Sequence, residues 1–379
     1  MKMENKISAE IINHSKGENG GELITYKLTY PRIILAEFNT HKMIMKNTSS
    51  SRAIPFEKMV EVVKKEPFIP LAFQCQHKGM QGSQYITDPY VIEKKKEKWL
   101  KARNKAINSA VDLSEEEISA SYYTNDENGV PIHTKDIYVE NSSVSKQLCN
   151  RLLESFMWVT QIVTGSREAF ENLFRLRCPI YDVSNEILSL ATSDTETAFK
   201  SKKEVIKRFP QLYDKDDLWW LQHNKGQAEI HFMDLAEKMY DALNESKPVE
   251  LKAGEWHIPF SNEPSFTPEM SLKDKIVLSC TMIARTSYTK IGDEQNISLE
   301  TARKIFDKCK KERHDSIFEH AGRCMTEEEY ETWIRGRVIE DGYDYDYFKE
   351  TLEEVKGWNK AFRGFLQLRT FIEENYEIN

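Results

Sequence analysis

Residues 40–52, THKMIMKNTSSSR, gather cationic and hydroxyl side chains directly after a strand-like run. Ser50, Ser51 and Arg52 offer hydroxyl and guanidinium donors close together, and arginine is the side chain suited to bidentate contact with a phosphate. The chain has neither a Walker phosphate loop nor a GxGxxG turn, so a phosphate bound here would be held by side chains. The alternative is a polar loop whose serines cap a helix that begins near Phe56.

A second candidate is an arginine on the apolar face of a predicted helix. In residues 168–177, EAFENLFRLR, the side chains of Phe170, Leu173 and Phe174 recur at helical spacing, and the next position on that face is Arg177. A guanidinium on an apolar face is costly unless an anion or a hydrogen-bonding group meets it. Arg177 therefore indicates a bound anion or another hydrogen-bonding partner; the alternatives are a nearby carboxylate, or solvent at the helix end.

A third candidate is the segment HDSIFEH, which places His314, Ser316, Glu319 and His320 within residues 314–320. Histidine and glutamate can bind a metal, but the spacing is not that of HExxH, and no further group of ligands stands out. We therefore expect no metal here. A serine and a glutamate are better suited to a hydrogen-bonding loop that ends against a cofactor.

The composition indicates a folded protein, because 40% of the 379 residues are hydrophobic and 30% are charged. A net charge of -8 argues against a general binder of nucleic acid or of an anionic membrane, so any anion site must be local. The first residues lack the apolar core of a signal peptide, and no run approaches membrane-spanning length. The cysteines are scattered without a CxxC pair, so we expect reduced thiols and a cytoplasmic location: Cys75, Cys149, Cys178, Cys280, Cys309 and Cys324.

These residues must be positioned by a mixture of strands and helices. Residues 23–38 predict a half-buried strand that continues past Pro31, with Tyr26 on the face toward the core and Thr25 on the opposite face. The Lys-rich residues 91–112 predict a helix.

The middle of the chain predicts helices joined by one exposed segment. Residues 121–143 are turn-rich and predict a surface excursion, while residues 180–222 predict an inserted helical subdomain that its two tryptophans, Trp219 and Trp220, pack down. Residues 226–243 predict an amphipathic helix. A long core helix from residue 144 onward is predicted by apolar residues at helical spacing: Leu148, Leu152, Phe156, Val159 and Val163.

Together these segments resemble the flavin-dependent thymidylate synthases (ThyX). HKMIMKNTSSSR resembles the signature of that family, in which Arg-His-Arg is followed by a spaced Ser, Asn, Ser and Arg. ARTSY and HDSIFEH resemble two further blocks of the family, and NRLLESF, NLFRLR and GQAEI resemble its helical blocks. The resemblance implies an α+β fold, with a mixed or antiparallel sheet and flanking helices, and a single catalytic domain over residues 1–379.

The order of the blocks differs from the usual family arrangement. In the family the ARxSY and HxSxxEH blocks come first, whereas here they come last, at 284–288 and 314–320. The chain thus resembles a circularly permuted, phage-type form in which residues 272–379 correspond to the usual N-terminus. Permutation is tolerated when the contacts survive while the connection moves. A bacterial cytoplasm or a phage-infected host cell is the implied location.

The resemblance also assigns the nucleotide site. Arg52 and Arg151 are implied as ligands of the phosphate, and Arg177 is implied to meet the pyrimidine carbonyls and to stabilise charge as C5 becomes nucleophilic. Ser50 is the only plausible attacking hydroxyl, but no adjacent base is present to activate it, so we assign it to binding. The implied residues of this site are Glu37, Ser50, Ser51, Arg52, Arg151 and Arg177.

The cofactor and co-substrates follow from the same resemblance. FAD is the implied cofactor, NADPH the reductant, 5,10-methylenetetrahydrofolate the carbon donor and dUMP the acceptor, in a homotetramer whose active sites are shared between subunits. The protein's own part would be orientation and electrostatics. The implied residues of the flavin site are His41, Lys42, Asn47, Asn172, Ser287, His314, Ser316, Glu319 and Arg369.

The signature nevertheless departs from the family pattern. Its Arg-His-Arg triplet reads Thr40-His41-Lys42, and the serine that normally follows is Met45. A glutamine expected before the triplet is Glu37, the acidic residue after the asparagine is Thr48, and the closing tyrosine is Ala53. The loss of one arginine, at Thr40, and the change of another to Lys42 weaken bidentate contact without abolishing positive charge. Residues Gln367 and Arg369, brought near by the permutation, are expected to supply the missing amide and guanidinium.

Two alternatives to thymidylate synthesis stay open at this point. The first is a relative that modifies C5 of another pyrimidine nucleotide such as dCMP, by methyl or hydroxymethyl transfer, because the carboxylate of Glu37 near the base could accept from an exocyclic amine. The second is a nucleotide-binding module that has lost catalysis, which the departures at Thr40 and Met45 suggest.

Overall fold

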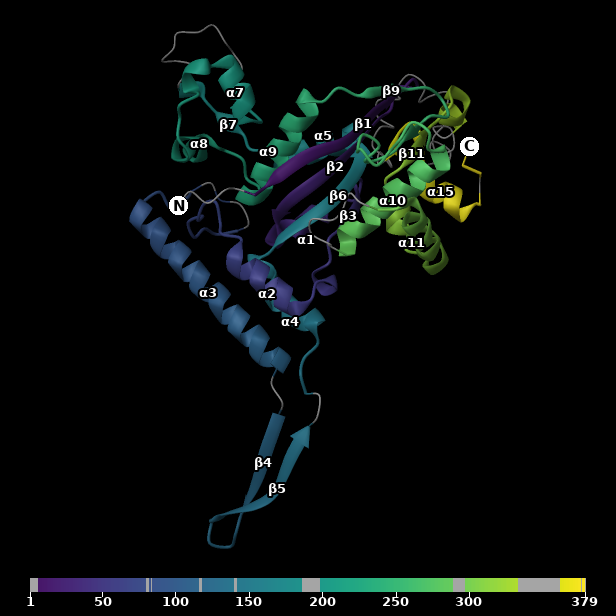
Figure 1. Cartoon of the computed structure of the whole chain (residues 1–379). Helices are drawn as coiled ribbons and strands as arrows, with labels where there is room; N and C mark the ends of the chain where they lie inside the picture. Colours follow the sequence, from purple (N-terminus) through teal and green to yellow (C-terminus); the bar gives the residue numbers. More distant parts are fainter. Residues whose placement is uncertain are drawn as a thin grey trace, which may run out of the picture.

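The computed structural model describes residues 6–79, 82, 84–115, 118–139, 142–185, 198–288, 297–332, 362–375 and 377–378. For residues 118, 119, 138, 287 and 288 it describes the backbone alone. The chain is a mixed α+β protein with one mixed sheet, further small antiparallel sheets, and flanking helices (Figure 1). This confirms the expected α+β class.

The central element is a five-stranded sheet whose strands lie in the order β3-β6-β2-β1-β9. All neighbours are antiparallel except β1 and β9, which are parallel. The strand β2 lies in the middle and is paired along both edges, and other layers of the protein cover both of its faces, so Thr25 is as fully buried as Tyr26 and the strand is not half-buried as predicted. The strands are β1 (Ser8–Gly17), β2 (Glu22–Pro31), β3 (Met45–Thr48), β6 (Trp158–Ser166) and β9 (Val249–Leu251).

Two helices cover one face of this sheet, α5 (Arg167–Arg177) and α9 (Ile230–Glu245). The helix α5 begins where Ser166 accepts a hydrogen bond from the backbone N–H of Ala169, and it ends shortly before Pro179. Both helices place apolar residues against the Tyr26 face of β2, in one continuous core. The predicted helices at 168–177 and 226–243 are therefore confirmed.

The other face of the sheet is covered by the C-terminal part of the chain (Figure 1). Ile162 of β6 packs into this second core, whereas its neighbour Val163 packs into the first, because successive strand residues point to opposite faces. The covering elements are α10 (Leu272–Tyr288), α11 (Leu299–Glu312), η5 (Asp315–Phe318), α15 (Leu368–Glu373) and a three-stranded sheet of β10 (Trp256–His257), β11 (Gly322–Cys324) and β12 (Phe365–Gln367).

A third group of helices packs beyond the end of the sheet and carries a hairpin that projects from the body (Figure 1). The Lys-rich helix predicted at 91–112 is confirmed as α3. The predicted excursion at 121–143 is exposed, and it is an antiparallel hairpin. The elements are η2 (Ser51–Ala53), α2 (Phe56–Lys65), α3 (Pro89–Glu115), β4 (Ile118–Asn125), β5 (Pro131–Val139), α4 (Lys146–Leu152) and η3 (Glu154–Phe156).

The predicted 180–222 subdomain contains short elements around a small core of its own, in which Trp220 is buried and packs edge-on against Tyr181. Trp219 lies at the margin of the same core. Part of this segment, 186–197, lies outside the described residues. The elements are β7 (Tyr181–Asp182), β8 (Ala198–Phe199), α7 (Lys202–Arg208), η4 (Pro210–Leu212) and α8 (Asp217–His223).

The predicted continuation of the first strand past Pro31 is wrong. The chain turns there into η1 (Arg32–Ile34) and α1 (Leu35–Phe38). Ile34 and Phe38 are four residues apart and are both buried, as on one face of a helix, and Leu35, Ala36 and Glu37 are good helix formers.

The predicted long core helix from residue 144 is also wrong. The helix α4 ends at Leu152, and Val159 and Val163 belong to the strand β6. Leu148 and Leu152 are largely exposed instead of forming a core face. Residues four apart share a face in a strand as well as in a helix, so this spacing did not distinguish the two.

Candidate functional site

Residues from the two ends of the chain meet at Asn47 of β3. The Asn47 side-chain amide donates to the backbone carbonyl of Ile283 in α10, at 2.6 Å. The hydroxyl of Ser316 in η5 donates to the Asn47 carbonyl oxygen, at 3.4 Å. Asn47 is buried, so these contacts fix β3 against α10 and η5. We call this meeting point, made by Asn47, Ile283 and Ser316, the junction.

Next to the junction, Lys46 is held by backbone carbonyls. Its ammonium donates to the carbonyls of His41 and Ile44, at 2.5 and 2.7 Å. Burial and the charge of Lys42 together lower the pKa of Lys46 to about 8, against the opposing effect of the Glu319 carboxylate. Glu319 therefore lies within electrostatic reach of the segment that begins at His41.

The C-terminal segment holds Glu319 in place. The Arg369 guanidinium pairs with the Glu319 carboxylate at 2.6 Å, and the Gln367 amide donates to the Glu319 backbone carbonyl at 3.0 Å. Arg369 also meets Asp315 and Glu373, at 3.6 and 2.8 Å. The expectation that Gln367 and Arg369 lie near this site is consistent with these contacts, while their replacement of the missing triplet residues stays a prediction.

Arg177 lies at the end of α5 and contacts three different groups. Its Nε donates to Nε2 of His41 at 3.1 Å, its Nη1 pairs with Glu37, and its guanidinium carbon lies 5.0 Å from the ring centre of Phe232. The alternative of a carboxylate partner is thus realised. Arg177 and Glu37 keep 22% and 31% of their side-chain surface exposed, so a ligand can reach both.

The protonation of His41 is set by these neighbours. Burial, together with the charges of Arg177 and Lys46, lowers the pKa of His41 to about 4. A neutral ring keeps a lone pair on Nε2, which is what the Arg177 donor requires.

Glu229, whose charge acts on Glu37, was not predicted from the sequence. Burial raises the pKa of the Glu37 carboxyl, and the nearby Glu229 carboxylate raises it further, against the effect of Arg177. Glu229 caps α9 by accepting from the N–H groups of His231 and Phe232, and it also contacts the His231 ring at 2.5 Å. Glutamate is not a preferred N-cap residue, so its place in GQAEI, just before an amphipathic helix, gave no clear signal of this role.

The Ser/Arg segment divides into a buried and an exposed part. The hydroxyl of Ser51 donates to Glu154 at 2.8 Å, and the Asn150 amide donates to the Ser51 carbonyl at 2.8 Å. Arg52 and Arg151 lie on these adjoining elements and are exposed. Neither guanidinium pairs with a carboxylate in the part of the chain that the structure describes, which leaves both open to an anion.

Not every predicted flavin residue contacts the junction. Asn172 accepts from Arg175 on the surface of α5, and His314 is half exposed, with its ring 3.9 Å from Glu312. Lys42 is exposed, and the side chain of Ser287 lies outside the described residues. The described residues contain no group of three histidine, cysteine or acidic side chains that could hold a metal ion.

A buried polar chain beneath the junction was not anticipated. Thr25 contacts Thr164 at 2.7 Å and His257 at 2.8 Å, and Thr164 contacts His320 at 2.8 Å. Burial lowers the pKa of both histidines to about 3, so both rings are neutral. His320 of the HDSIFEH segment therefore belongs to the core between the sheet and the C-terminal layer.

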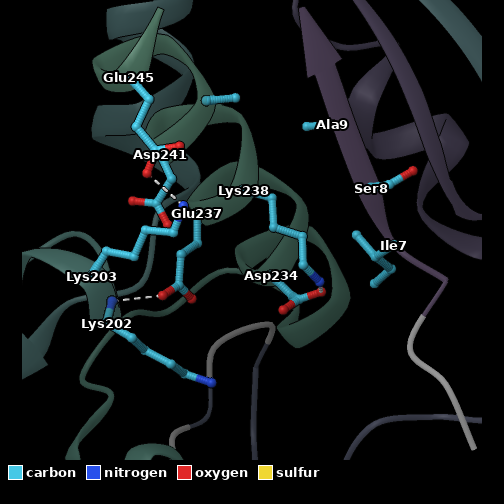
Figure 2. Close-up of a pocket in the computed structure, with 11 residues that line it drawn as sticks. Ile7, Ser8, Ala9, Lys202, Lys203, Asp234, Glu237, Lys238, Asp241 and Glu245 are labelled. Atoms are coloured by element: carbon cyan, nitrogen blue, oxygen red, sulfur yellow. Dashed lines mark hydrogen bonds and ion pairs between the residues drawn. The ribbon is translucent and has the colours of Figure 1, made fainter. Parts of the chain in front are cut away.

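A separate cavity of 640 Å³ lies between the start of β1, α7 and α9 (Figure 2). None of the predicted site residues lines it. Its buried carboxylate, Glu237, accepts from the backbone N–H of Lys202 at 2.7 Å and from the hydroxyl of Tyr181 at 2.9 Å. Glu237 thus joins α9 to the 181–223 segment.

All six cysteines are free thiols, as expected. Within the described residues, no helix combines the length and the apolar character needed to cross a membrane.

No protein-family model and no curated protein matches the chain. Two solved structures of the UMP/dUMP methylase PolB from Streptomyces cacaoi show a distant likeness. The structure bound with 5-Br UMP is 12% identical, with 46% of this chain and 78% of that chain covered and a TM-score of 0.31. The structure bound with 5-Br dUMP is 10% identical, with 59% and 95% covered and the same TM-score of 0.31. These values are too low to establish a shared fold.

Proposed function

We propose that this protein transfers a one-carbon group to C5 of a pyrimidine mononucleotide, with a flavin as its cofactor. The junction is the single observation that carries the proposal. Three of the segments that resemble ThyX blocks, at 41–52, 284–288 and 314–320, lie in different parts of the sequence, yet Asn47 is bonded to Ser316 and to Ile283 beside ARTSY. A circular permutation changes the order of the blocks along the chain but keeps their contacts, so it predicts that these three segments meet.

The residues at the junction are chemically suited to an anionic cofactor such as FAD. The charge of Lys42 helps to lower the pKa of Lys46, and a negative group between the two ammonium ions would relieve that repulsion. His41, Asn47, Ser316 and Glu319 would offer hydrogen bonds, with Lys42, Asn172, Ser287, His314 and Arg369 around them. FAD, reduced by NADPH, would supply the hydride and carbon-transfer chemistry from methylenetetrahydrofolate.

The chain's own residues would bind and orient the nucleotide. Arg52 and Arg151 would hold the phosphate, since exposed guanidinium groups on adjoining elements favour bidentate contact. Ser50 and Ser51 lie beside them; Ser50 would contact the phosphate, and Ser51 would hold the segment through Glu154. Arg177 would orient the base and stabilise charge that develops on it. An oligomer with shared sites, a tetramer by resemblance, is part of the same proposal.

The decisive experiment begins with the absorbance spectrum of the purified protein and with the mass of the molecule released on denaturation. FAD is the expected result. The protein is then incubated with dUMP or dCMP, NADPH and methylenetetrahydrofolate, and the nucleotide is analysed by mass spectrometry. A gain of mass on the base supports the proposal, and the size of the gain separates methyl from hydroxymethyl transfer.

A matched pair of variants controls that experiment. Arg52→Ala should lower turnover at low nucleotide concentration by about tenfold or more, whereas Lys58→Ala, on the exposed face of α2, should leave it unchanged. A colourless protein that binds the nucleotide but never alters it would contradict the proposal and indicate a binding module instead.

A further inference from the structure

Glu37 and Arg177 present a hydrogen-bond acceptor and a donor side by side. They pair with each other, and both remain partly exposed. Arg177 is held in place because its Nε donates to Nε2 of His41 and its guanidinium lies against the ring of Phe232. A planar base that reaches this pair would therefore meet a carboxylate on one side and a guanidinium on the other.

The side of this pair that Glu37 occupies has a negative electrostatic potential. The Glu229 carboxylate lies close enough to Glu37 to raise the pKa of its carboxyl. Glu229 is itself fixed, because it caps α9 and contacts the ring of His231. Two carboxylates within electrostatic reach of each other repel a carbonyl oxygen and attract an N–H group.

A buried hydroxyl lies near the same place. Burial raises the pKa of Tyr85, and the charge of Glu229 acts in the same direction, so its hydroxyl lies within electrostatic reach of that carboxylate. The Tyr85 hydroxyl is buried and has no hydrogen-bond partner in the described part of the chain. A buried hydroxyl without a partner is costly, and a ligand group that bonds to it removes that cost.

We propose that the base bound here is cytosine, with its exocyclic amine donating to Glu37 and its N3 accepting from Arg177. This inference rests on the proposed function, because it names the base of that nucleotide. Cytosine carries an amino group at C4 where uracil carries a carbonyl oxygen. The amine matches the acceptor of Glu37, whereas the O4 of uracil in the same position would face the Glu37 carboxylate, with the charge of Glu229 adding to the repulsion.

The chemistry at C5 adds to this preference. When C5 of uracil becomes nucleophilic, negative charge develops on O4, and carboxylates beside O4 oppose that charge. In cytosine the same position is an amine that donates a hydrogen bond throughout. A site built to hydrogen-bond one group rejects an analogue that lacks it, by about 10⁴-fold or more in favourable cases.

The test is the affinity of the full-length protein for dCMP and for dUMP, measured by calorimetry at pH 7. We expect the wild type to bind dCMP at least about tenfold more tightly than dUMP. Glu37→Gln should reverse this order, because a carboxamide donates an N–H to O4 while its oxygen accepts from N3–H. Glu171→Gln, the same change at an exposed position of α5, should leave the order unchanged.

Each outcome bears on a separate claim. A wild type that prefers dUMP overturns the cytosine inference and leaves the proposed function standing. A protein that binds neither nucleotide overturns both. Should Glu37→Gln fail to fold, the wild-type affinity ratio decides, with Glu229→Gln as a second variant that should weaken dCMP binding severalfold more than dUMP binding.

Discussion

The Nε of Arg177 donates to Nε2 of His41 at 3.1 Å, which fixes the imidazole in the tautomer that carries its proton on Nδ1. One side chain comes from the end of α5 and the other from the turn before β3. The bond therefore holds the proposed base-binding arginine against the segment proposed to hold the flavin.

We predict that His41 stays neutral at physiological pH. Its pKa of about 4 lies below the ordinary 6.5, so the unfolded chain binds a proton between pH 6.5 and 4 that the folded chain does not. The free energy of unfolding from this group should therefore fall as pH falls through that window. NMR titration of the imidazole C–H signal, assigned with His41→Asn, measures this, and a midpoint above pH 6 would contradict the prediction.

Ser50 and Ser51 should have separable effects. Ser51→Ala removes a buried hydrogen bond to Glu154 and should lower the free energy of unfolding by about 1–2 kcal/mol. Ser50→Ala should change stability by less than about 0.5 kcal/mol and weaken nucleotide binding. Urea unfolding and calorimetry on both variants measure the difference. Equal losses of stability would show that Ser50 is also a structural residue.

Arg52 and Arg151 should act on the phosphate alone. Replacing either with alanine should weaken binding of the mononucleotide about tenfold or more, because each loses a charge-assisted contact. Binding of the matching deoxyribonucleoside, which has no phosphate, should not change. Lys58→Ala is the control for a lost surface charge. If nucleoside binding falls as much as nucleotide binding, the two arginines do not form the phosphate site.

Glu237 should make stability fall as pH rises. Burial raises the pKa of its carboxyl from 4.5 to about 7, so the folded chain keeps a proton between these values that the unfolded chain has lost. Its contribution to the free energy of unfolding should decrease by up to about 3 kcal/mol across that range and stay constant above pH 7.

The measurement is chemical unfolding at several pH values for the wild type and Glu237→Gln. The difference between the two should follow the predicted slope. Glu245→Gln, an exposed position on the same helix, should track the wild type. A difference that does not depend on pH would contradict the raised pKa.

Local patterns predicted some elements well and others poorly. The helices α5 and α9 follow from the helical spacing of their apolar residues, and α3 was predicted from its Lys-rich sequence. The strand β6 was read as part of a helix because Val159 and Val163 share a face in either structure. Its strand neighbours, β2 and β3, lie more than 100 residues earlier, and no local pattern encodes that pairing.

The sequence by itself determined which chemical groups are available: the Ser/Arg segment, the arginine on an apolar helix face, and the order of the blocks that resemble ThyX. Only the tertiary structure decided their partners, because Asn47 with Ile283, Arg177 with Glu37, and Arg369 with Glu319 meet through the packing of the layers around the sheet. The pKa values of His41 and Lys46 follow from those neighbours and from burial, which the order of residues does not specify.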